Sequence, residues 1–258
     1  MSDHGQAGYR IRFDWGLTGA RALVADARPG DVAVVVDVLS FTTSLTVAVE
    51  QGIAVYPFPW AADEAPAYAE QRGAVLARGR RAGLAEGSVS LSPASFEGAA
   101  GIERVVLPSP NGSTIAFALA ESGVSVIGAC LRNAGAVARW VAGTGGAVRV
   151  IAAGERWPDG SLRPAVEDLW GAGAVLAALG ALRRQEGVSP EARSAAAAYD
   201  VVRGELETAL PDSAGGRELV SAGFARDVEI AAAADVSSVV PVLHGEAFVD
   251  GAGQPDRF

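Results

Sequence analysis

Cysteine and histidine are almost absent from this chain of 258 residues, which contains one cysteine and two histidines. Because Cys130 stands alone, no disulfide can form within the chain, and we expect a reducing compartment, the cytoplasm. His4 lies in a polar N-terminal stretch and His244 is isolated near the C-terminus. A Ser-His-Asp catalytic arrangement therefore has little support.

Long apolar runs and positive charge are also scarce. The first residues lack the apolar segment of a signal peptide, and glycine or charge interrupts every apolar stretch well short of a membrane span. Lys and Arg total 21 against 30 acidic residues, a formal charge of −9, which argues against nucleic acid or an anionic membrane as the main partner. We expect a soluble protein in which an anionic substrate needs local help from arginine or a metal ion.

Short β-branched segments alternate with helix-like segments along most of the chain, beginning with the apolar run Val32–Val36. This rhythm predicts an α/β fold with three layers, in which helices cover both faces of a mostly parallel sheet. Beyond Gln185 the chain becomes mainly helical, with 190–210 helical throughout and a last strand at 236–243. We expect one domain over residues 1–258, with a possible division into lobes of about 1–105 and 106–258. The apolar helices are compatible with a homodimer.

Prolines end one of the predicted strands. The segment Ile53–Tyr56 has the composition of a short strand, but Pro57 and Pro59 follow it. Because proline lacks the N–H that a strand ladder needs, no further regular structure is expected there.

The stretch Asp31–Glu50 joins a buried strand to a helix through a turn rich in hydroxyl groups. Asp37 follows the strand directly, so it is expected at the carboxyl edge of the sheet, where ligands bind in open α/β sheets. Ser40 or Thr42 could cap the next helix, whose first N–H groups favour an anion. A carboxylate beside an anion site suits a metal-bridged phosphate, although a capped turn with a solvated aspartate would give the same pattern.

Three further strand ends carry polar residues. The loop 107–114 offers the hydroxyl and N–H groups of a helix start, which could hold a phosphate or merely cap the helix. Asn133 after the next strand has the character of a helix cap. Glu155 follows a third strand, and Glu167 and Asp168 open the helix after it. If the strands are neighbours, these acids converge with Asp37, and carboxylates without His or Cys favour Mg²⁺ over Zn²⁺.

Several nucleotide and phosphate chemistries have no signature here. No Walker A loop or GxGxxG pattern follows a strand. Leu39, rather than a second aspartate, lies two positions after Asp37, so an aspartyl-phosphate mechanism is not indicated. Metal-assisted attack of water on a phosphate ester is the chemistry that remains.

Taken together, these loops resemble the 2-phosphosulfolactate phosphatase (ComB-like) family over roughly Asp31 to Val242. The matching pieces are VVVDVL…FTTS (Val34–Ser44), LSP (Leu91–Pro93), SPNGS (Ser109–Ser113), RNA (Arg132–Ala134), AAGE (Ala152–Glu155), EDLWGAG (Glu167–Gly173) and GRELVSAGFARDVEIAA (Gly216–Ala232). The resemblance implies an Mg²⁺-dependent α/β enzyme that hydrolyses 2-phospho-3-sulfolactate to 3-sulfolactate and phosphate, a step toward coenzyme M.

The resemblance also implies roles for single residues. The candidates for catalysis are Asp37 and Glu155. The candidates for metal binding are Asp37, Glu155, Glu167 and Asp168. The candidates for binding phosphate are Thr42, Thr43, Asn111, Gly112, Ser113 and, from the long loop after residue 77, Arg80.

The sequence departs from the family pattern at three places. Ser40 stands where the family has an arginine, and Leu91 where it has an asparagine. Arg78–Arg80 replaces an expected Gly-Glu-Arg. Because serine cannot grip a sulfonate or phosphate as a guanidinium does, Arg78, Arg80 or Arg81 would have to supply the missing charge. A phosphatase of a different phosphoester, or a non-catalytic protein that binds a small anion, are the alternatives.

Overall fold

A central sheet with helices on both faces organises the computed structural model, which describes residues 3–60, 63–80, 88–182 and 187–252. Within these residues the sheet has nine strands, in the order β1-β7-β2-β6-β10-β11-β3-β5-β4. Their bounds are Ile11–Trp15 (β1), Val32–Val36 (β2), Ala54–Pro59 (β3), Val75–Leu76 (β4), Arg104–Ser109 (β5), Ser125–Ala129 (β6), Val148–Ala152 (β7), Pro241–His244 (β10) and Ala247–Asp250 (β11). Glu155–Arg156 (β8) and Leu162–Arg163 (β9) form a separate hairpin.

Most of the helices alternate with the strands along the chain, as the sequence predicts. Their bounds are Gly16–Val24 (α1), Phe41–Glu50 (α2), Ala65–Gln71 (α3), Gly112–Leu119 (α4), Ala134–Gly143 (α5), Val166–Leu182 (α6), Pro190–Val202 (α7), Leu206–Asp212 (α8), Ala214–Ser221 (α9) and Ala225–Ala232 (α10). The predicted α/β class and the helical C-terminal part are therefore confirmed. None of the helices in the described ranges has both the length and the apolar character that a membrane span requires.

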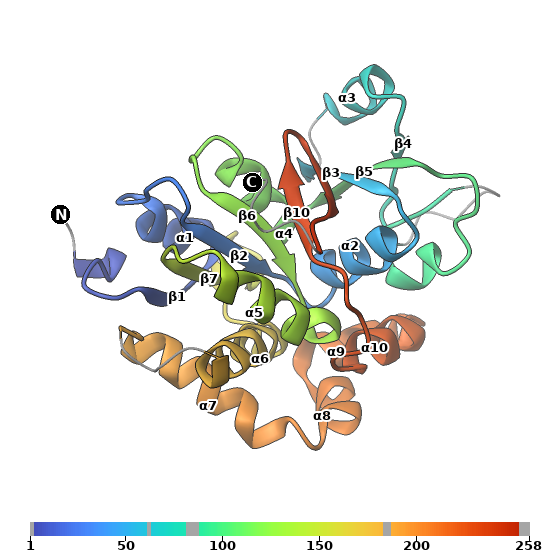
Figure 1. The fold of residues 1–258 in the computed structure, drawn as a ribbon. Coiled ribbons are helices and arrows are strands. Elements are labelled where there is room, and N and C mark those ends of the chain that lie inside the picture. Colours follow the sequence, from blue (N-terminus) through green and yellow to red (C-terminus); the bar gives the residue numbers. More distant parts are fainter. Residues whose placement is uncertain (1–2, 61–62, 81–87, 183–186, 253–258) are drawn as a thin grey trace.

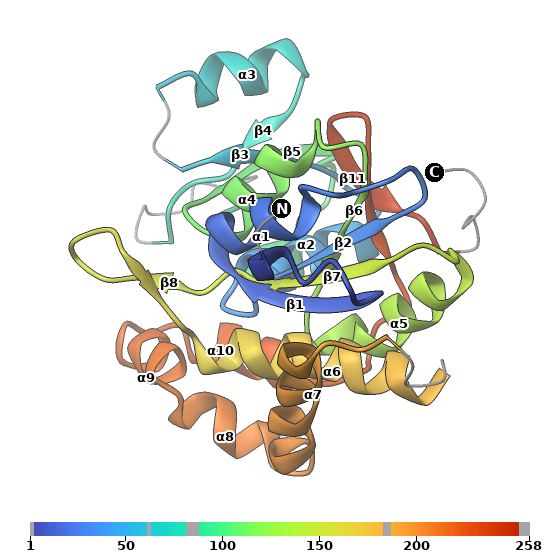
Figure 2. The same cartoon turned by 90° about the vertical axis from the view of Figure 1, so that its left-hand side faces the viewer.

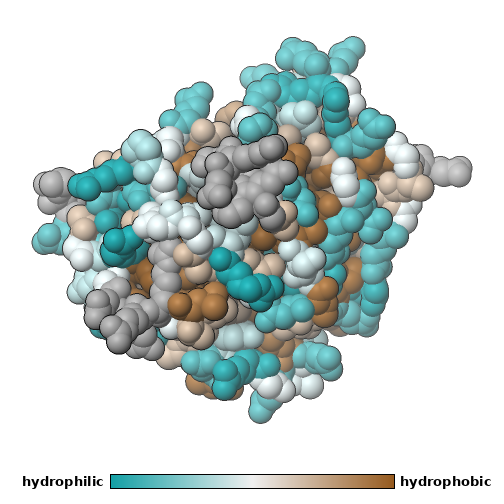
Figure 3. Space-filling model, in the orientation of Figure 1, coloured by the Kyte–Doolittle hydropathy of each residue, from teal (hydrophilic) through white to brown (hydrophobic). Residues whose placement is uncertain are grey.

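The side chains of β2 show why the sheet has two covered faces. Val32, Val34 and Val36 belong to a core cluster with residues of α5, α6 and α7, whereas Ala33 and Val35 belong to a cluster with α1, α2 and α4. Successive strand residues point to opposite faces, so an unbroken apolar run requires helices on both. Figure 2 shows these two layers, with α5–α7 below the sheet and α1, α2 and α4 above it. On the face in Figure 3, hydrophilic residues predominate over α3 and hydrophobic ones form separate patches.

Two groups of parallel strands make up the sheet (Figure 1). The strands β1, β7, β2 and β6 form one group, and β3, β5 and β4 the other. The hairpin β10–β11 lies between them, and all three pairings from β6 to β3 are antiparallel. An odd number of antiparallel pairings gives the two groups opposite directions across the sheet. The turns after β2 and β5 nevertheless meet, as the hydrogen bonds described below show.

The expectation that Pro57 and Pro59 end regular structure is wrong. Both lie in β3, which pairs with β5 from Ala54 to Pro59. The N–H of Ala54 donates to the carbonyl of Glu103, on the side of β3 where β5 lies. Because successive backbone nitrogens of a strand point to opposite sides, those of residues 55, 57 and 59 face β11. On that side the pairing consists of Val55 with Phe248. Proline therefore removes no ladder hydrogen bond here.

Two other expected elements differ in their bounds. The predicted helix over 190–210 is two helices, α7 and α8, separated by a break after Val202. The predicted last strand is later and shorter than expected, because 236–240 is irregular and β10 begins at Pro241. The strand β11 after it, which pairs with both β10 and β3, was not expected at all.

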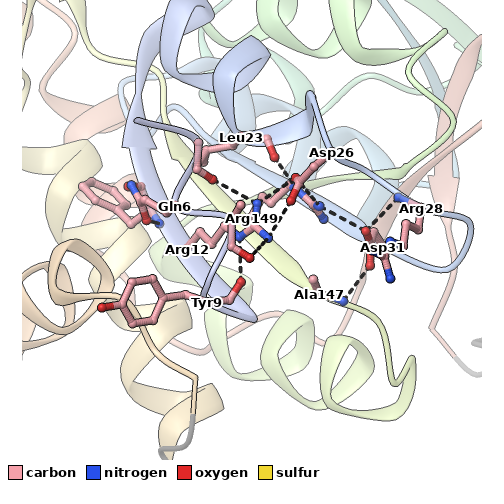
Figure 4. A network of polar contacts seen from close by, with 12 residues as sticks. Gln6, Tyr9, Arg12, Leu23, Asp26, Arg28, Asp31, Ala147 and Arg149 are labelled. Carbon is pink, nitrogen blue, oxygen red and sulfur yellow. Dashed lines mark hydrogen bonds and ion pairs between the residues drawn. The ribbon is translucent and has the colours of Figure 1, made fainter. Parts of the chain in front are cut away.

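Two buried arginines hold the start of the first parallel group together (Figure 4). Arg12 in β1 donates to both carboxylate oxygens of Asp26, at 2.8 and 3.0 Å. Arg149 in β7 is 1% exposed and forms ion pairs with Asp26 at 3.2 Å and Asp31 at 3.0 Å. Its Nε donates to the carbonyl of Leu23 at 2.6 Å. This network lies where β1 and β7 begin, whereas the predicted acids follow the ends of β2 and β7.

Candidate functional site

Asp37 joins the turns that follow β2 and β5. Its Oδ1 accepts from the backbone N–H of Phe41 at 3.1 Å, and its Oδ2 accepts from the N–H of Gly112 at 2.7 Å. A Cβ atom at Gly112 would lie 2.6 Å from the Cβ of Asp37 and 2.7 Å from Phe41. The close approach of the two helix starts therefore requires glycine at position 112.

Burial governs the charge of Asp37. The side chain is 5% exposed, so the alternative of a solvated aspartate is wrong. Burial raises the pKa of Asp37, while the N–H groups of Gly112 and Phe41, and then the positive charge of Arg80, oppose that rise.

Glu155 lies at the start of β8, directly after the turn that follows β7. The side-chain amide of Asn111 donates to its Oε2 at 2.9 Å. Burial, and next the negative charge of Asp37, raise the pKa of Glu155 to about 7. At neutral pH this carboxyl group can therefore both hold and release a proton.

Asp168 and Glu167 are buried in the first turn of α6. Asp168 accepts from the N–H of Val38 at 2.7 Å and from that of Gly154 at 2.8 Å, so it links the turns after β2 and β7. The carboxylate of Glu167 lies against α9, where a Cβ at Gly215 would be 2.2 Å from Oε1. Burial raises the pKa of both acids, and the charge of Asp37 raises it further.

The structure brings the four predicted acids into one region. The charge of Asp37 raises the pKa of the other three, and the charges of Glu155 and Glu167 raise that of Asp168. Among the residues that the structure describes, no three acidic, histidine or cysteine side chains are arranged, as they stand, to hold one metal ion. The donor set still fits Mg²⁺, which prefers carboxylate oxygens and keeps several waters. A divalent cation would also relieve the mutual repulsion of these buried acids.

The residues predicted to bind phosphate fall into two groups. Asn111 and Gly112 contact the acids through Glu155 and Asp37. The hydroxyls of Thr42 and Thr43 are instead buried and hydrogen bonded to backbone groups of the turn after β2. That of Ser113 is buried and hydrogen bonded to backbone groups of β3 and β5. Hydroxyl groups used in this way stabilise the local backbone, and within the described residues none of the three is hydrogen bonded to a carboxylate oxygen of the four acids.

Two arginines contribute positive charge to the acids. Arg80 lowers the pKa of Asp37, and its Nη2 donates to the hydroxyl of Ser40. Arg163 in β9 lowers the pKa of Glu155 and Glu167. Of the other arginines considered from sequence, Arg78 pairs through its backbone with the chain at Ser90 and Arg81 lies outside the described residues.

Sequence reasoning missed three residues of this region. Arg163 carries no motif of its own and reaches the acids through the β8–β9 hairpin. Ser109 donates to Oδ2 of Asp37 at 3.4 Å, and Asp227 accepts from Nε of Arg80 at 3.1 Å. Both lie inside segments that match the family, so the match itself was the available signal.

A cavity of about 310 Å³ opens beside Glu155 and Asn111. Trp15, Ile115 and Leu162 are among its walls. A larger cavity of about 540 Å³ between α6 and α7 contains none of the four acids. The smaller cavity therefore gives a ligand access to Glu155, one of the four acids.

Comparison with known proteins gives the family. The model of the 2-phosphosulpholactate phosphatase family matches residues 20–246. The chain belongs to this family. A protein of Deinococcus radiodurans named as a probable 2-phosphosulfolactate phosphatase is 33% identical over 230 residues, 86% of this chain and 91% of that protein. A protein of Carboxydothermus hydrogenoformans with the same name is 30% identical over 215 residues, 82% of this chain and 85% of that protein.

Membership of the 2-phosphosulfolactate phosphatase family makes the chain a phosphoric monoester hydrolase by class. Two departures from the family pattern now have a structural setting. Arg80 donates to the hydroxyl of Ser40, so a guanidinium lies beside the position where the family's arginine is missing. Leu91 accepts from the hydroxyl of Ser44 through its backbone carbonyl at 2.7 Å, a contact that any side chain at position 91 permits.

Proposed function

We propose that the protein hydrolyses 2-phospho-3-sulfolactate to 3-sulfolactate and phosphate, and that it requires Mg²⁺. The observation that supports this proposal is the convergence of Asp37, Glu155, Glu167 and Asp168 beside two arginines. Buried acids that repel one another are expected where a cation completes the site. The family of the chain supports the substrate.

Several of the acids would coordinate Mg²⁺ together. Asp37, Glu155, Glu167 and Asp168 are the proposed ligands, and the oxygens of Asp37 and of Asp168 also accept two backbone N–H groups each. When bound, Mg²⁺ supplies a positive charge that neutralises phosphate oxygens and makes a water molecule more acidic.

The protein's own residues would do the rest. Arg80 and Arg163 attract the anionic substrate into an otherwise negative region. A water oxygen attacks phosphorus, the ester P–O bond breaks, and the leaving oxygen receives a proton to give the alcohol of 3-sulfolactate. Glu155 takes up the proton that the attacking water loses, while Asn111 fixes the orientation of its carboxylate.

Phosphate release by the purified full chain tests this proposal. Activity should require Mg²⁺ after treatment with a chelator, and Asp37→Asn should lower kcat by about 100-fold or more. Glu70→Gln, at an exposed acid of α3, is the control and should keep wild-type activity. Full activity in chelator, or in the Asp37 variant, would remove the metal role.

A different phosphoester is the second candidate, and the absence of the family's arginine at Ser40 is the observation that favours it. Because Arg80 approaches Ser40 from another part of the chain, its reach into the site differs from that of an arginine at position 40. A panel of phosphate monoesters compared by kcat/KM decides between the two. A non-catalytic anion-binding protein would shift its melting temperature with these compounds and release no phosphate. A cytoplasmic location, a homodimer and a role in coenzyme M formation stay predictions.

A further inference from the structure

The guanidinium of Arg80 lies between two side chains from distant parts of the sequence. Its Nε donates to Oδ2 of Asp227 at 3.1 Å, and its Nη2 donates to the hydroxyl of Ser40. Asp227 is 1% exposed and the side chain of Arg80 is 16% exposed. This ion pair is therefore largely shielded from solvent, where breaking it leaves an uncompensated charge.

The carboxylate of Asp227 is itself fixed. Its Oδ1 accepts from the hydroxyl of Ser92 and, more weakly, from the N–H of Ala94 at 3.5 Å. The N–H of Asp227 donates to the carbonyl of Phe224, whose ring lies 5.9 Å from Cζ of Arg80. Asp227 thus ties three segments together: α10, the segment 92–94 and Arg80.

The ion pair holds the guanidinium between Asp227 and the turn after β2. Asp227 accepts from Nε and Ser40 accepts from Nη2, and the positive charge of Arg80 lowers the pKa of Asp37, the acid that follows β2. An arginine that is ordered only when substrate arrives loses side-chain entropy at that moment. Ordering it beforehand removes that cost from binding.

We propose that Asp227 is a positioning residue that holds Arg80 beside Ser40 so that its Nη groups receive the phosphoryl oxygens of the substrate. This inference rests on the proposed function, since it assigns how that site binds its anion. Neither the family match nor the sequence motifs assign a role to Asp227.

Binding of inorganic phosphate, the product, tests the inference without relying on turnover. Calorimetric titration in Mg²⁺ should show Kd about tenfold or more higher for Asp227→Asn and for Arg80→Ala than for wild type. The double variant should bind no more weakly than Arg80→Ala alone, because the effect of Asp227 passes through Arg80. Glu229→Gln, an exposed acid of the same helix, should keep the wild-type Kd.

The kinetic prediction separates positioning from general damage. Asp227→Asn should raise KM by a similar factor while kcat changes less than about threefold. A merely structural role would lower kcat and the folded fraction in both the wild-type and the Arg80→Ala backgrounds, and would overturn the proposal.

Arg80→Lys serves if Asp227→Asn does not fold. Lysine keeps the charge but cannot donate from a fork to Asp227 and toward the substrate at once. Its phosphate Kd should approach that of Arg80→Ala, and a wild-type Kd would overturn the proposal. If the wild-type protein released no phosphate from the substrate, the proposed function would be contradicted. The measurements of phosphate binding test the role of Asp227 separately, because they need no turnover.

Discussion

The side-chain amide of Asn111 donates a hydrogen bond to Oε2 of Glu155 over 2.9 Å, and so joins the turn after β5 to the start of β8. This contact favours the charged form of Glu155, whereas burial and the charge of Asp37 favour the protonated form. The balance leaves the pKa of Glu155 at about 7. The charge of Glu155 consequently changes within the physiological range.

The first prediction concerns the pH dependence of Mg²⁺ binding. The pKa of Glu155 is raised to about 7, so below this pH a proton must leave before the carboxylate can hold a cation. We expect the affinity for Mg²⁺ to fall by up to about tenfold per pH unit below 7 and to level off above it. Calorimetry at pH 6 and pH 8, in buffers of different ionisation enthalpy, measures both the affinity and the protons released.

Two variants make that prediction specific. Glu155→Gln should weaken Mg²⁺ binding and remove most of its pH dependence, while Glu70→Gln should behave as wild type. Equal affinity of the wild-type protein at pH 6 and pH 8 would show that Glu155 does not exchange its proton for the ion.

The second prediction concerns Gly112. A Cβ at this position would lie within 2.7 Å of Cβ and Oδ2 of Asp37, so Gly112→Ala must displace Asp37 or separate α2 from α4. We expect phosphatase activity to fall at least tenfold and the free energy of unfolding to fall by about 1–3 kcal/mol. Gly98→Ala is the matched control, because a Cβ there meets nothing within 4 Å. Equal loss in both variants would contradict the explanation.

Much of the first parallel group could be predicted from sequence. The run Val32–Val36 required helices on both faces, and this requirement fixed Asp37 at the end of a buried strand. The proximity of Asp37 to Glu155 followed from the assumption that their strands are neighbours, and β2 and β7 do pair.

Other features depend on contacts that no local pattern reports. The hairpin β10–β11 enters the middle of the sheet through single bridges to β6 and β3, so neither its position nor the reversal of the second strand group has a sequence signature. The hydroxyls of Thr42 and Thr43 were predicted to bind phosphate, but threonine at a helix start can equally bond its own turn, as it does here. The pairing of Arg80 with Asp227 spans 147 positions.

The third prediction concerns stability in acid. The hydrogen bond from Arg12, and next that from Arg149, hold the pKa of Asp26 at about 2, below its ordinary value of 3.8. The folded protein thus binds this proton less readily than the unfolded chain, so the contribution to stability is present above about pH 4 and disappears as the pH falls through about 2. Since Asp26 is partly exposed, we expect that contribution to be only about 1–2 kcal/mol.

Asp26→Asn measures this contribution. Urea unfolding should show the variant less stable than wild type at pH 7, with the difference shrinking steadily between pH 4 and pH 2. Asp63→Asn, at an exposed aspartate before α3, should show no such difference at any pH. A deficit in Asp26→Asn that stays constant down to pH 2 would mean that packing, and not charge, is lost.

The last prediction concerns Glu167 and compares the protein with and without Mg²⁺. Without the ion, Glu167 is a buried acid repelled by Asp37, and burial with this repulsion raises its pKa. Removing its charge should therefore leave Glu167→Gln at least as stable as wild type in chelator. In saturating Mg²⁺ the order of stability should reverse, because bound Mg²⁺ stabilises the wild type more than a variant that binds it more weakly. A tenfold loss of affinity corresponds to about 1.4 kcal/mol.

Thermal unfolding with chelator and with Mg²⁺ measures this reversal, and Glu207→Gln, at an exposed acid in the first turn of α8, is the control. If Glu167→Gln is less stable than wild type by the same amount in both conditions, the side chain supports packing against Gly215 and holds no ion.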